Sequence, residues 1–397
     1  MGASMRNLSQ GNRLIDSGEL SSVKYVQLTA RSTGWAESVV FSKHCELRSK
    51  GNDSWVFWGR GAHEQDEFMQ RICNPLNTYL DAVLTRIDDR AGFHSRMPTR
   101  RLLKRLDAID PDIVHLHILH GYWINIEMLF GWLASHRCRV IWTQHDCWAF
   151  TGHCANFIYA NCAQWQSHCA YSEKCPQLNA YPKTLFQGNC VQNYADKKRI
   201  FTSIPASRLT LVSPSKWLAE IISESFFDDY PIEIIPNHID ETVFRPVQSN
   251  WRKRLGIGNR FMVLGVANPW TERKGFGDFL EVSRIIGSDV AIVLVGLNKK
   301  QLEGLPEGVI GIERTADQRE LAELYSDADL FCILSYEENY PTVALEARAC
   351  GAQIIAYDAG GTSEAVGPEA EIVGVGDVTA VCESIMRRKR ENREEHH

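Results

Sequence analysis

The stretch LFCILSYEENYPTVALEARACG, residues 330–351, contains the two kinds of element that the whole chain repeats. Its first eight residues form an apolar run with the length of a buried strand. The segment from Pro341 to Cys350 reads as a helix with proline in its first turn, where the missing N–H of proline costs no hydrogen bond. The stretch therefore predicts a strand, a short loop and a helix.

The same order of strand and helix recurs along the 397 residues, which are too many for one ordinary core. Strands that alternate with helices form parallel sheets covered on both faces. The fold class is therefore α/β, with two doubly wound, Rossmann-like domains at residues 22–240 and 241–390. Buried strands are predicted at residues 23–30, 53–59, 112–117, 139–146, 208–215, 261–268, 291–298, 330–337 and 352–359.

Composition and charge narrow the class of protein. With 44% hydrophobic and 23% charged residues, the chain has the composition of a globular protein. A net charge of −6 argues against a dedicated nucleic-acid-binding protein. No apolar run is long enough to span a bilayer, and the polar first 22 residues lack the apolar core of a signal peptide. We therefore expect a cytoplasmic protein.

Two acids flank the start of the helix in the opening stretch. Glu338 follows the strand at its carboxyl end, and Glu346 lies about two turns into the helix. Carboxylates accept hydrogen bonds from sugar hydroxyls, and the amides near Pro341 to Val343 suit a phosphate. Both acids can face one ligand, because such sheets bind ligands beyond the carboxyl ends of their strands, here in the cleft expected between two domains. On spacing alone, the simpler interpretation is a solvated Glu338 and a Glu346 paired across the helix.

The E-x7-E pair is followed by A-C-G, and further stretches match one family in the expected order. Together they resemble the retaining glycosyltransferases of family 4, which have the GT-B fold, with two Rossmann-like domains facing each other across a cleft. The resemblance extends from about residue 22 to residue 385. The matching stretches are LVSPSKWLAEII (211–222), IIPNHIDETVFRP (234–246), RKGFGDFLE (273–281), LAELYSDADLFCILS (321–335) and DAGGTSEAV (358–366). Two more, HLHILHGYW (115–123) and TQHDCWAFTGHC (143–154), look closest to bacterial capsule, exopolysaccharide and colanic-acid transferases.

The resemblance implies a hexosyltransferase that acts in surface polysaccharide synthesis. The C-terminal domain would bind a UDP- or GDP-sugar, and the N-terminal domain would bind a glycan or a polyprenyl-diphosphate-linked acceptor. Attack on the face that the nucleotide leaves would retain configuration, and the leaving phosphate would take the acceptor's proton. Because the protein's part in such a reaction is positioning and charge stabilisation, we expect catalysis without a metal ion.

The resemblance also implies roles for particular residues. It assigns Glu346 to the ribose hydroxyls, Glu338 to the transferred sugar and Lys274 to the diphosphate, which gains negative charge as the sugar departs. His145 corresponds to a histidine near the reacting sugar, so the predicted catalytic set is His145, Glu338 and Lys274. The predicted donor-binding set is Gly34, Asn268, Arg273, Lys274, Glu338, Tyr340, Pro341, Thr342, Val343 and Glu346.

The chain departs from the family pattern at two positions. A phosphate-binding arginine of the family falls near Asn268, and Arg273 is the candidate to replace it. Trp35 stands after Gly34 where a second glycine is common, and its bulk opposes a close backbone approach to phosphate. Two alternatives stay open. One is a nucleotide-sugar epimerase or isomerase of the same fold, and the other is a nonenzymatic nucleotide-sugar-binding homologue, to which the missing arginine points.

The histidines of HLHILH, residues 115–120, are interpreted without a metal ion. Strand alternation puts His115 and His117 on one face of a strand. We expect them to be buried or to line the acceptor site, as we do His120.

An insertion at residues 150–180 is rich in cysteine, with intervals of 7, 6 and 5 residues between successive thiols. Four thiolates in a loop-rich segment are typical of a structural zinc site, in which His153 or His168 can replace one thiolate. A reducing cytosol favours zinc over disulfides, and zinc would fold a segment that has no core of its own. Two disulfides or buried free thiols are the alternatives. The four residues are Cys154, Cys162, Cys169 and Cys175.

Residues 94–109, HSRMPTRRLLKRLDAI, contain five basic residues, and Leu102, Leu103 and Leu106 share one helical face. Such a helix can lie on an anionic membrane, or it can be an ordinary surface helix. The first interpretation suits an enzyme that acts on lipid-linked sugars at the inner face of the cytoplasmic membrane.

Overall fold

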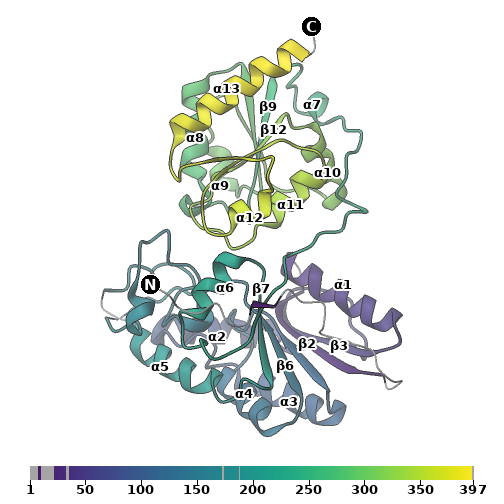
Figure 1. The fold of residues 1–397 in the computed structure, drawn as a ribbon, viewed down its shortest axis with the longest axis vertical. Helices are drawn as coiled ribbons and strands as arrows, with labels where there is room; N and C mark the ends of the chain where they lie inside the picture. Colours follow the sequence, from purple (N-terminus) through teal and green to yellow (C-terminus); the bar gives the residue numbers. More distant parts are fainter. Residues whose placement is uncertain (1–7, 10–21, 33–34, 172–173, 187, 396–397) are drawn as a thin grey trace. The chain divides into compact units, whose positions relative to one another are not determined.

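The chain folds into two compact units, residues 1–236 and 237–397, in a computed structural model. Each unit is a parallel sheet with helices packed against it (Figure 1), which confirms the expected α/β class with two doubly wound domains. None of the described helices combines the length and the apolar character that crossing a membrane requires. The structure describes residues 8–9, 22–32, 35–171, 174–186 and 188–395.

The sheet of the first unit has the strand order β1-β8-β7-β6-β5-β2-β3-β4. The sheet grows from β2 to β4 in one direction and from β5 to β8 in the other. The reversal between β2 and β5 is the topological switch point, where doubly wound sheets bind ligands. The strands are β1 (Leu8–Ser9), β2 (Lys24–Arg31), β3 (Asp53–Arg60), β4 (Met69–Arg71), β5 (Ile113–Leu116), β6 (Arg139–Thr143), β7 (Leu209–Ser213) and β8 (Ile232–Ile234).

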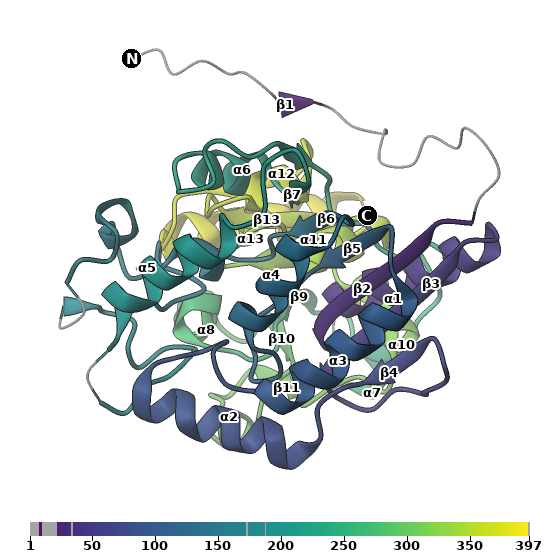
Figure 2. The ribbon, with the colours of Figure 1, turned by 90° about the horizontal axis from the view of Figure 1, so that it is seen from below.

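Alternate residues of these strands are buried on opposite faces of the sheet. Tyr25 and Ile113 pack with Leu47 on one face, whereas Val26 and Val114 belong to the large core on the other. Helix α1 therefore covers the first face, and α3, α4, α5 and α6 contribute to the large core (Figures 1 and 2). The helices are α1 (Trp35–Ser49), α2 (Pro75–Asp88), α3 (Arg96–Ile109), α4 (Ile126–Ser135), α5 (Cys190–Phe201) and α6 (Lys216–Ser223).

The face that α3 buries corrects one interpretation of the sequence. Leu102 and Leu106 are fully buried in the large core, and Leu103 packs against it. These leucines therefore hold α3 on the sheet and do not form a membrane-facing stripe. The basic residues of α3 are exposed, namely Arg96, Arg100, Arg101, Lys104 and Arg105.

The sheet of the second unit has the strand order β11-β10-β9-β12-β13-β14, again all parallel. Counted along the chain, this is the order 3-2-1-4-5-6 of a dinucleotide-binding fold, with its switch point between β9 and β12. The strands are β9 (Phe261–Val266), β10 (Val290–Val295), β11 (Val309–Ile312), β12 (Leu330–Ile333), β13 (Ile354–Tyr357) and β14 (Glu371–Val373).

Helices cover both faces of this second sheet. All residues of β10 are buried, as expected for a central parallel strand. Helices α10 and α11 pack with the apolar cluster of one face, and α8 and α13 pack with that of the other. The helices are α7 (Trp251–Arg254), α8 (Phe276–Ile286), α9 (Lys299–Glu303), α10 (Gln318–Asp327), α11 (Thr342–Ala349), α12 (Thr362–Val366) and α13 (Val378–Glu395).

Candidate functional site

The switch point of the second unit gathers most of the predicted donor residues. Strands β9 and β12 are parallel neighbours, so the loops that follow them leave the same edge of the sheet. The first loop contains Asn268, which is exposed, and ends in a 3-10 turn at Glu272–Lys274. The second loop, residues 334–341, contains Glu338 and leads into α11. Gly34, the remaining predicted donor residue, lies outside the described residues.

A glycine brings these two loops together. Gly275 has a φ of +72°, and a β-carbon at this position would lie 2.0 Å from the carbonyl oxygen of Leu334. Only glycine allows both this conformation and this close approach. The backbone N–H of Tyr336 also donates to the carbonyl of Arg273 at 2.8 Å, which ties the turn to the loop after β12.

The contact of the two loops creates a charged cluster. Lys274 Nζ forms an ion pair with Glu338 Oε1, and Arg273 Nη1 donates to the carbonyl oxygen of Glu337 at 2.6 Å. Burial raises the pKa of Glu338, but the charges of Lys274 and Arg273 outweigh it and hold this pKa below its ordinary value. The cluster therefore holds a carboxylate that can accept hydrogen bonds from hydroxyls, beside two cations that suit a diphosphate.

Glu346 has different surroundings from Glu338. It lies in α11, 8% exposed, and accepts a hydrogen bond from Tyr325 Oη at 3.0 Å. Burial raises the pKa of Glu346 to about 7, against the smaller effects of hydrogen bonds from Tyr325 and Thr342. The two acids thus occupy one strand–loop–helix segment but differ in their readiness to carry charge at neutral pH.

The start of α11 presents backbone amides next to this segment. Pro341 caps the helix in an extended conformation, so the first amides of α11 are those of Thr342 and Val343. The first N–H groups of a helix have no partner within it and suit anions. Tyr340 immediately precedes Pro341, and its carbonyl accepts from Asn237 Nδ2 at 2.9 Å.

The first unit holds the predicted catalytic histidine in a row of imidazoles. His145 lies two residues beyond β6, and its Nε2 is 3.2 Å from Nδ1 of His117. The rings of His115 and His117 have centroids 4.1 Å apart, as their shared strand face predicts. The hydroxyl of Tyr25 lies 2.8 Å from His115 Nδ1 and continues the row into the sheet.

Burial keeps these imidazoles neutral at physiological pH. It lowers the pKa of His115 to about 3 and that of His145 to about 4, and it lowers the pKa of His117 as well. A neutral imidazole has one donor and one acceptor nitrogen, so His145 is suited to a hydrogen bond with a hydroxyl.

A second polar chain at this edge was not expected from the sequence. Asp146 Oδ2 is 2.7 Å from His120 Nε2, and His120 Nδ1 is 2.9 Å from the hydroxyl of Tyr181. Asp146 follows His145 directly, so the pair His-Asp at a strand end was the available signal. Tyr181 comes 36 positions after His145, and no local pattern connects the two.

The four predicted zinc ligands share a small cavity of the first unit with Cys190 and His153. Both ring nitrogens of His153 are engaged, by Asp89 at 2.5 Å and by the carbonyl of Gln177 at 3.0 Å. Within the described residues, no group of three or more His, Cys, Asp or Glu side chains is placed to hold a metal ion. The predicted structural zinc is thus not supported, and the cysteines are free thiols.

Two of these thiols form a distinct pair. The Cys190 thiol donates a hydrogen bond to the sulfur of Cys175, and this bond lowers the pKa of the Cys175 thiol. Burial instead raises the pKa of Cys154 and of Cys169, so these two stay protonated.

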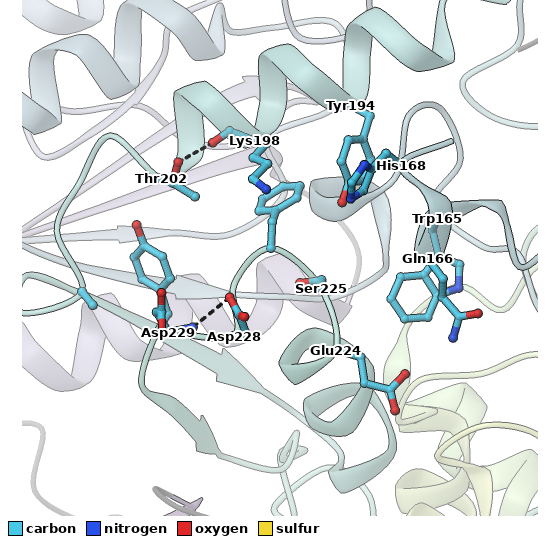
Figure 3. Close-up of a pocket in the computed structure, with 13 residues that line it drawn as sticks. Trp165, Gln166, His168, Tyr194, Lys198, Thr202, Glu224, Ser225, Asp228 and Asp229 are labelled. Atoms are coloured by element: carbon cyan, nitrogen blue, oxygen red, sulfur yellow. Dashed lines mark hydrogen bonds between the residues drawn. The ribbon is translucent and has the colours of Figure 1, made fainter. Parts of the chain in front are cut away.

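A larger recess of about 590 Å³ lies in the first unit between α5, the loop after α6 and the 3-10 turn Gln164–Ser167 (Figure 3). His168, the alternative zinc ligand, is found here, with its ring stacked on Tyr194 at a centroid distance of 5.1 Å (Figure 3). Among the described residues, none of the predicted catalytic or donor-binding side chains lines this recess.

Comparison with known proteins agrees with this architecture. A family model described as Glycosyltransferase Family 4 matches residues 36–243, and one described as Glycosyl transferases group 1 matches residues 259–388. The putative colanic acid biosynthesis glycosyl transferase WcaC of Escherichia coli (strain K12) is 25% identical over 335 residues, covering 81% of this chain and 80% of that protein.

Solved structures share the fold at low sequence identity. Sucrose-phosphate synthase of Thermosynechococcus elongatus is 18% identical with a TM-score of 0.66, over 92% of this chain and 89% of the other. Anabaena HepE in complex with UDP-glucose is 15% identical with a TM-score of 0.62, over 93% and 91% of the two chains. Fold and comparisons together define a glycosyltransferase of the GT-B type. The chain belongs to Glycosyltransferase Family 4, whose model matches more than half of it.

Proposed function

We propose that this glycosyltransferase moves a sugar, with retention of configuration, from a UDP- or GDP-sugar to a glycan or lipid-linked acceptor in surface polysaccharide synthesis. The observation that carries the proposal is the Lys274–Glu338 pair at the switch point of the second sheet. A cation and a carboxylate in contact match the two parts of a sugar nucleotide, its diphosphate and its sugar hydroxyls.

The names of similar proteins support this choice of substrates. HepE is described in complexes with UDP and with UDP-glucose. A Campylobacter jejuni relative, 32% identical over 120 residues, is named a diacetylbacillosaminyl-diphospho-undecaprenol N-acetylgalactosaminyltransferase. We therefore assign the donor to the second unit and the acceptor to the first, with the protein at the cytoplasmic face of the membrane.

In this mechanism the charged cluster rearranges when the donor binds. The diphosphate replaces Glu338 as the partner of Lys274, and the released carboxylate accepts a hydrogen bond from the transferred sugar. Arg273 and the amides of Thr342 and Val343 supply further positive potential to the leaving phosphate. The positive charge needed by the leaving group thus comes from side chains and amides, and the departing phosphate takes the proton of the acceptor hydroxyl.

Glu346 of the second unit and His145 of the first unit have further proposed roles. The carboxylate of Glu346 accepts hydrogen bonds from the ribose hydroxyls, which favours its charged form over the buried neutral form. Neutral His145, oriented by His117 at 3.2 Å, bonds a hydroxyl of the reacting sugar. In the proposed reaction, these groups act by positioning and by charge stabilisation.

Calorimetric titration with UDP, GDP, ADP and TDP tests the proposal. We expect one nucleotide to bind, and Lys274→Ala to weaken its binding, while Lys253→Ala, an exposed lysine of α7, leaves binding unchanged. Absence of binding by all four nucleotides, or equal binding by Lys274→Ala and the parent, would contradict the proposed donor site.

Transfer itself separates the enzyme from its alternatives. The nucleotide sugar that corresponds to the bound nucleotide is incubated with a polyprenyl-diphosphate-linked sugar, and the product is analysed by NMR. A product whose anomeric carbon has the same configuration, axial or equatorial, as in the donor supports retention. A changed sugar on an intact nucleotide would instead indicate an epimerase, and binding without any reaction would indicate a nonenzymatic homologue.

A further inference from the structure

Helix α2, Pro75–Asp88, turns its apolar side to solvent. The exposed side chains recur at intervals of three and four residues, which places them on a single face of the helix. A helix that packs on a core buries such a stripe, so α2 has the opposite orientation. The exposed fractions are 64% for Leu76, 66% for Tyr79, 50% for Leu80, 45% for Leu84 and 50% for Ile87.

The polar side of α2 holds the helix in this orientation. Asp81 and Thr85 are almost fully buried, and Thr85 Oγ1 donates to Asp81 Oδ1 at 3.2 Å. The hydroxyl of Ser95, just before α3, donates to the other oxygen of Asp81. At the start of the helix, the side chain of Asn74 caps the N–H of Asn77 at 2.8 Å. Polar anchoring thus leaves the apolar face free for another contact.

Two further apolar side chains extend this face. Leu185 and Phe186 are 61% and 65% exposed. The N–H of Leu185 donates to the carbonyl of Arg86 in the last turn of α2 at 2.8 Å, so this loop lies against the end of the helix. We call these seven residues the α2 face: Leu76, Tyr79, Leu80, Leu84, Ile87, Leu185 and Phe186.

Positive charge accompanies the α2 face. The five basic side chains of α3 are exposed, and the Ser95–Asp81 bond fixes the start of α3 to the middle of α2. The two acids at the end of α2 have partners of their own, Asp88 with His94 at 3.2 Å and Asp89 with His153 at 2.5 Å. This basic segment contrasts with the net charge of −6 of the whole chain.

We propose that the α2 face docks this protein on an anionic lipid membrane. An exposed apolar stripe on a helix inserts into the boundary between headgroups and acyl chains, and neighbouring lysines and arginines attract anionic headgroups. The ring of Tyr79 suits the same boundary, because it is apolar with a polar tip. The proposal adds a contact surface to the membrane placement given under the proposed function, and its test needs neither donor nor acceptor.

Charge favours a membrane over a second copy of the chain. A twofold contact through the α2 face would bring the basic side chains of two α3 helices toward each other. Their repulsion would oppose the gain from apolar burial, whereas anionic lipid neutralises the same charges. The seven exposed apolar side chains also belong to one helix and the loop against its end, which is typical of a contact surface.

Vesicle flotation with the full chain tests the proposal. Phosphatidylcholine vesicles with 30% phosphatidylglycerol are compared with pure phosphatidylcholine vesicles. We expect the parent to float with the anionic vesicles, and Leu80→Gln/Leu84→Gln to bind at least about tenfold more weakly, because bound affinity follows the buried apolar area. Arg100→Glu/Arg101→Glu should lose the preference for anionic vesicles.

Matched controls separate docking from unfolding. Ile285→Gln changes a side chain of α8 that is 57% exposed, and it should leave flotation unchanged. All these variants should have the circular dichroism spectrum and the nucleotide affinity of the parent. The substituted side chains face solvent and lie outside the charged cluster around Lys274 and Glu338. Equal flotation of the parent and the leucine variant, or no flotation of the parent, overturns the proposal. A parent dimer that the leucine variant converts to monomer, without flotation of either, would assign the face to a second copy instead.

Discussion

Replacing Glu346 by glutamine should reveal how much stability the second unit gives up to keep an acid in a buried position. The pKa of Glu346 rises from 4.5 to about 7 because its carboxyl is buried, at 8% exposure. In the folded state this group therefore holds its proton to higher pH than in the unfolded state. Stability from this residue is full below about pH 4.5 and is lost as the pH rises through about 7.

The size of the effect follows from the shift. A rise from 4.5 to about 7 corresponds to about 3 kcal/mol of unfolding free energy lost by pH 8. Glutamine has nearly the same shape, keeps an oxygen that accepts from Tyr325 and never ionises. Glu346→Gln should thus match the parent near pH 4.5 and be more stable than the parent at pH 8, by up to about 3 kcal/mol.

Hydrogen exchange of α11 reports the stability of the second unit alone, whereas a melting curve combines the unfolding of both units. Amide exchange in the peptides that cover residues 318–349 is followed at pH 5 and pH 8 for parent and variant. Slower exchange in the variant at pH 8 only, together with weaker nucleotide binding, is the expected result. An equal difference at both pH values, or faster exchange in the variant at pH 8, would refute the burial argument.

Three further predictions concern other residues. Lys274→Ala should weaken binding of the nucleoside diphosphate by about 1.5–3 kcal/mol, roughly tenfold to a hundredfold by calorimetry, because it removes a charged hydrogen bond to the phosphate. Gly275→Ala should lower the unfolding free energy by at least about 2 kcal/mol in urea titration, because a β-carbon would lie 2.0 Å from the carbonyl oxygen of Leu334 at a positive φ. Cys175 should be alkylated by iodoacetamide faster than Cys154 or Cys169 at pH 7, and Cys190→Ala should slow it, because the Cys190 thiol stabilises the Cys175 thiolate.

Each of these predictions has a simple counter-result. An unchanged nucleotide affinity of Lys274→Ala would show that Lys274 does not bind the phosphate. An unaltered urea midpoint for Gly275→Ala means that the loop after β12 shifts at little cost. Equal alkylation of Cys175, Cys154 and Cys169 in peptide mapping, or the same Cys175 rate in Cys190→Ala as in the parent, would contradict the stabilisation of the Cys175 thiolate by Cys190.

The central strands could be predicted because burial on both faces leaves a continuous apolar run. The predicted segment 261–268 contains β9, and 291–298 covers β10 apart from its first residue, Val290; both strands are buried along most of their length. The edge strands β4 and β14 have no fully buried residue, so their sequences lack the continuous apolar run that predicts a buried strand. The predicted strand 330–337 also ended too late, because β12 stops at Ile333.

Other features depend on which side of an element is inward, and spacing does not contain that information. The periodicity of α3 was correct, but its leucines face the core instead of lipid. The stripe on α2 has the same spacing and faces solvent, because Ser95, which lies outside the helix, bonds the buried Asp81 on the opposite side. The Lys274–Glu338 pair joins residues 64 positions apart, so only the strand order 3-2-1-4-5-6 brings them together.

The charged cluster around Lys274 and Glu338 is built within one unit, and this affects how the protein can diversify. Glu338 interacts with Lys274, Arg273 and Ser335, and Glu346 interacts with Tyr325 and Thr342, all of them in the second unit. If this cluster binds the sugar nucleotide as proposed, substitutions that change its specificity can accumulate in residues 237–397 while the first unit keeps its own core and polar chains. Under the proposed function, the donor can thus change while the acceptor stays the same, which is one physical route to a varied set of surface glycans.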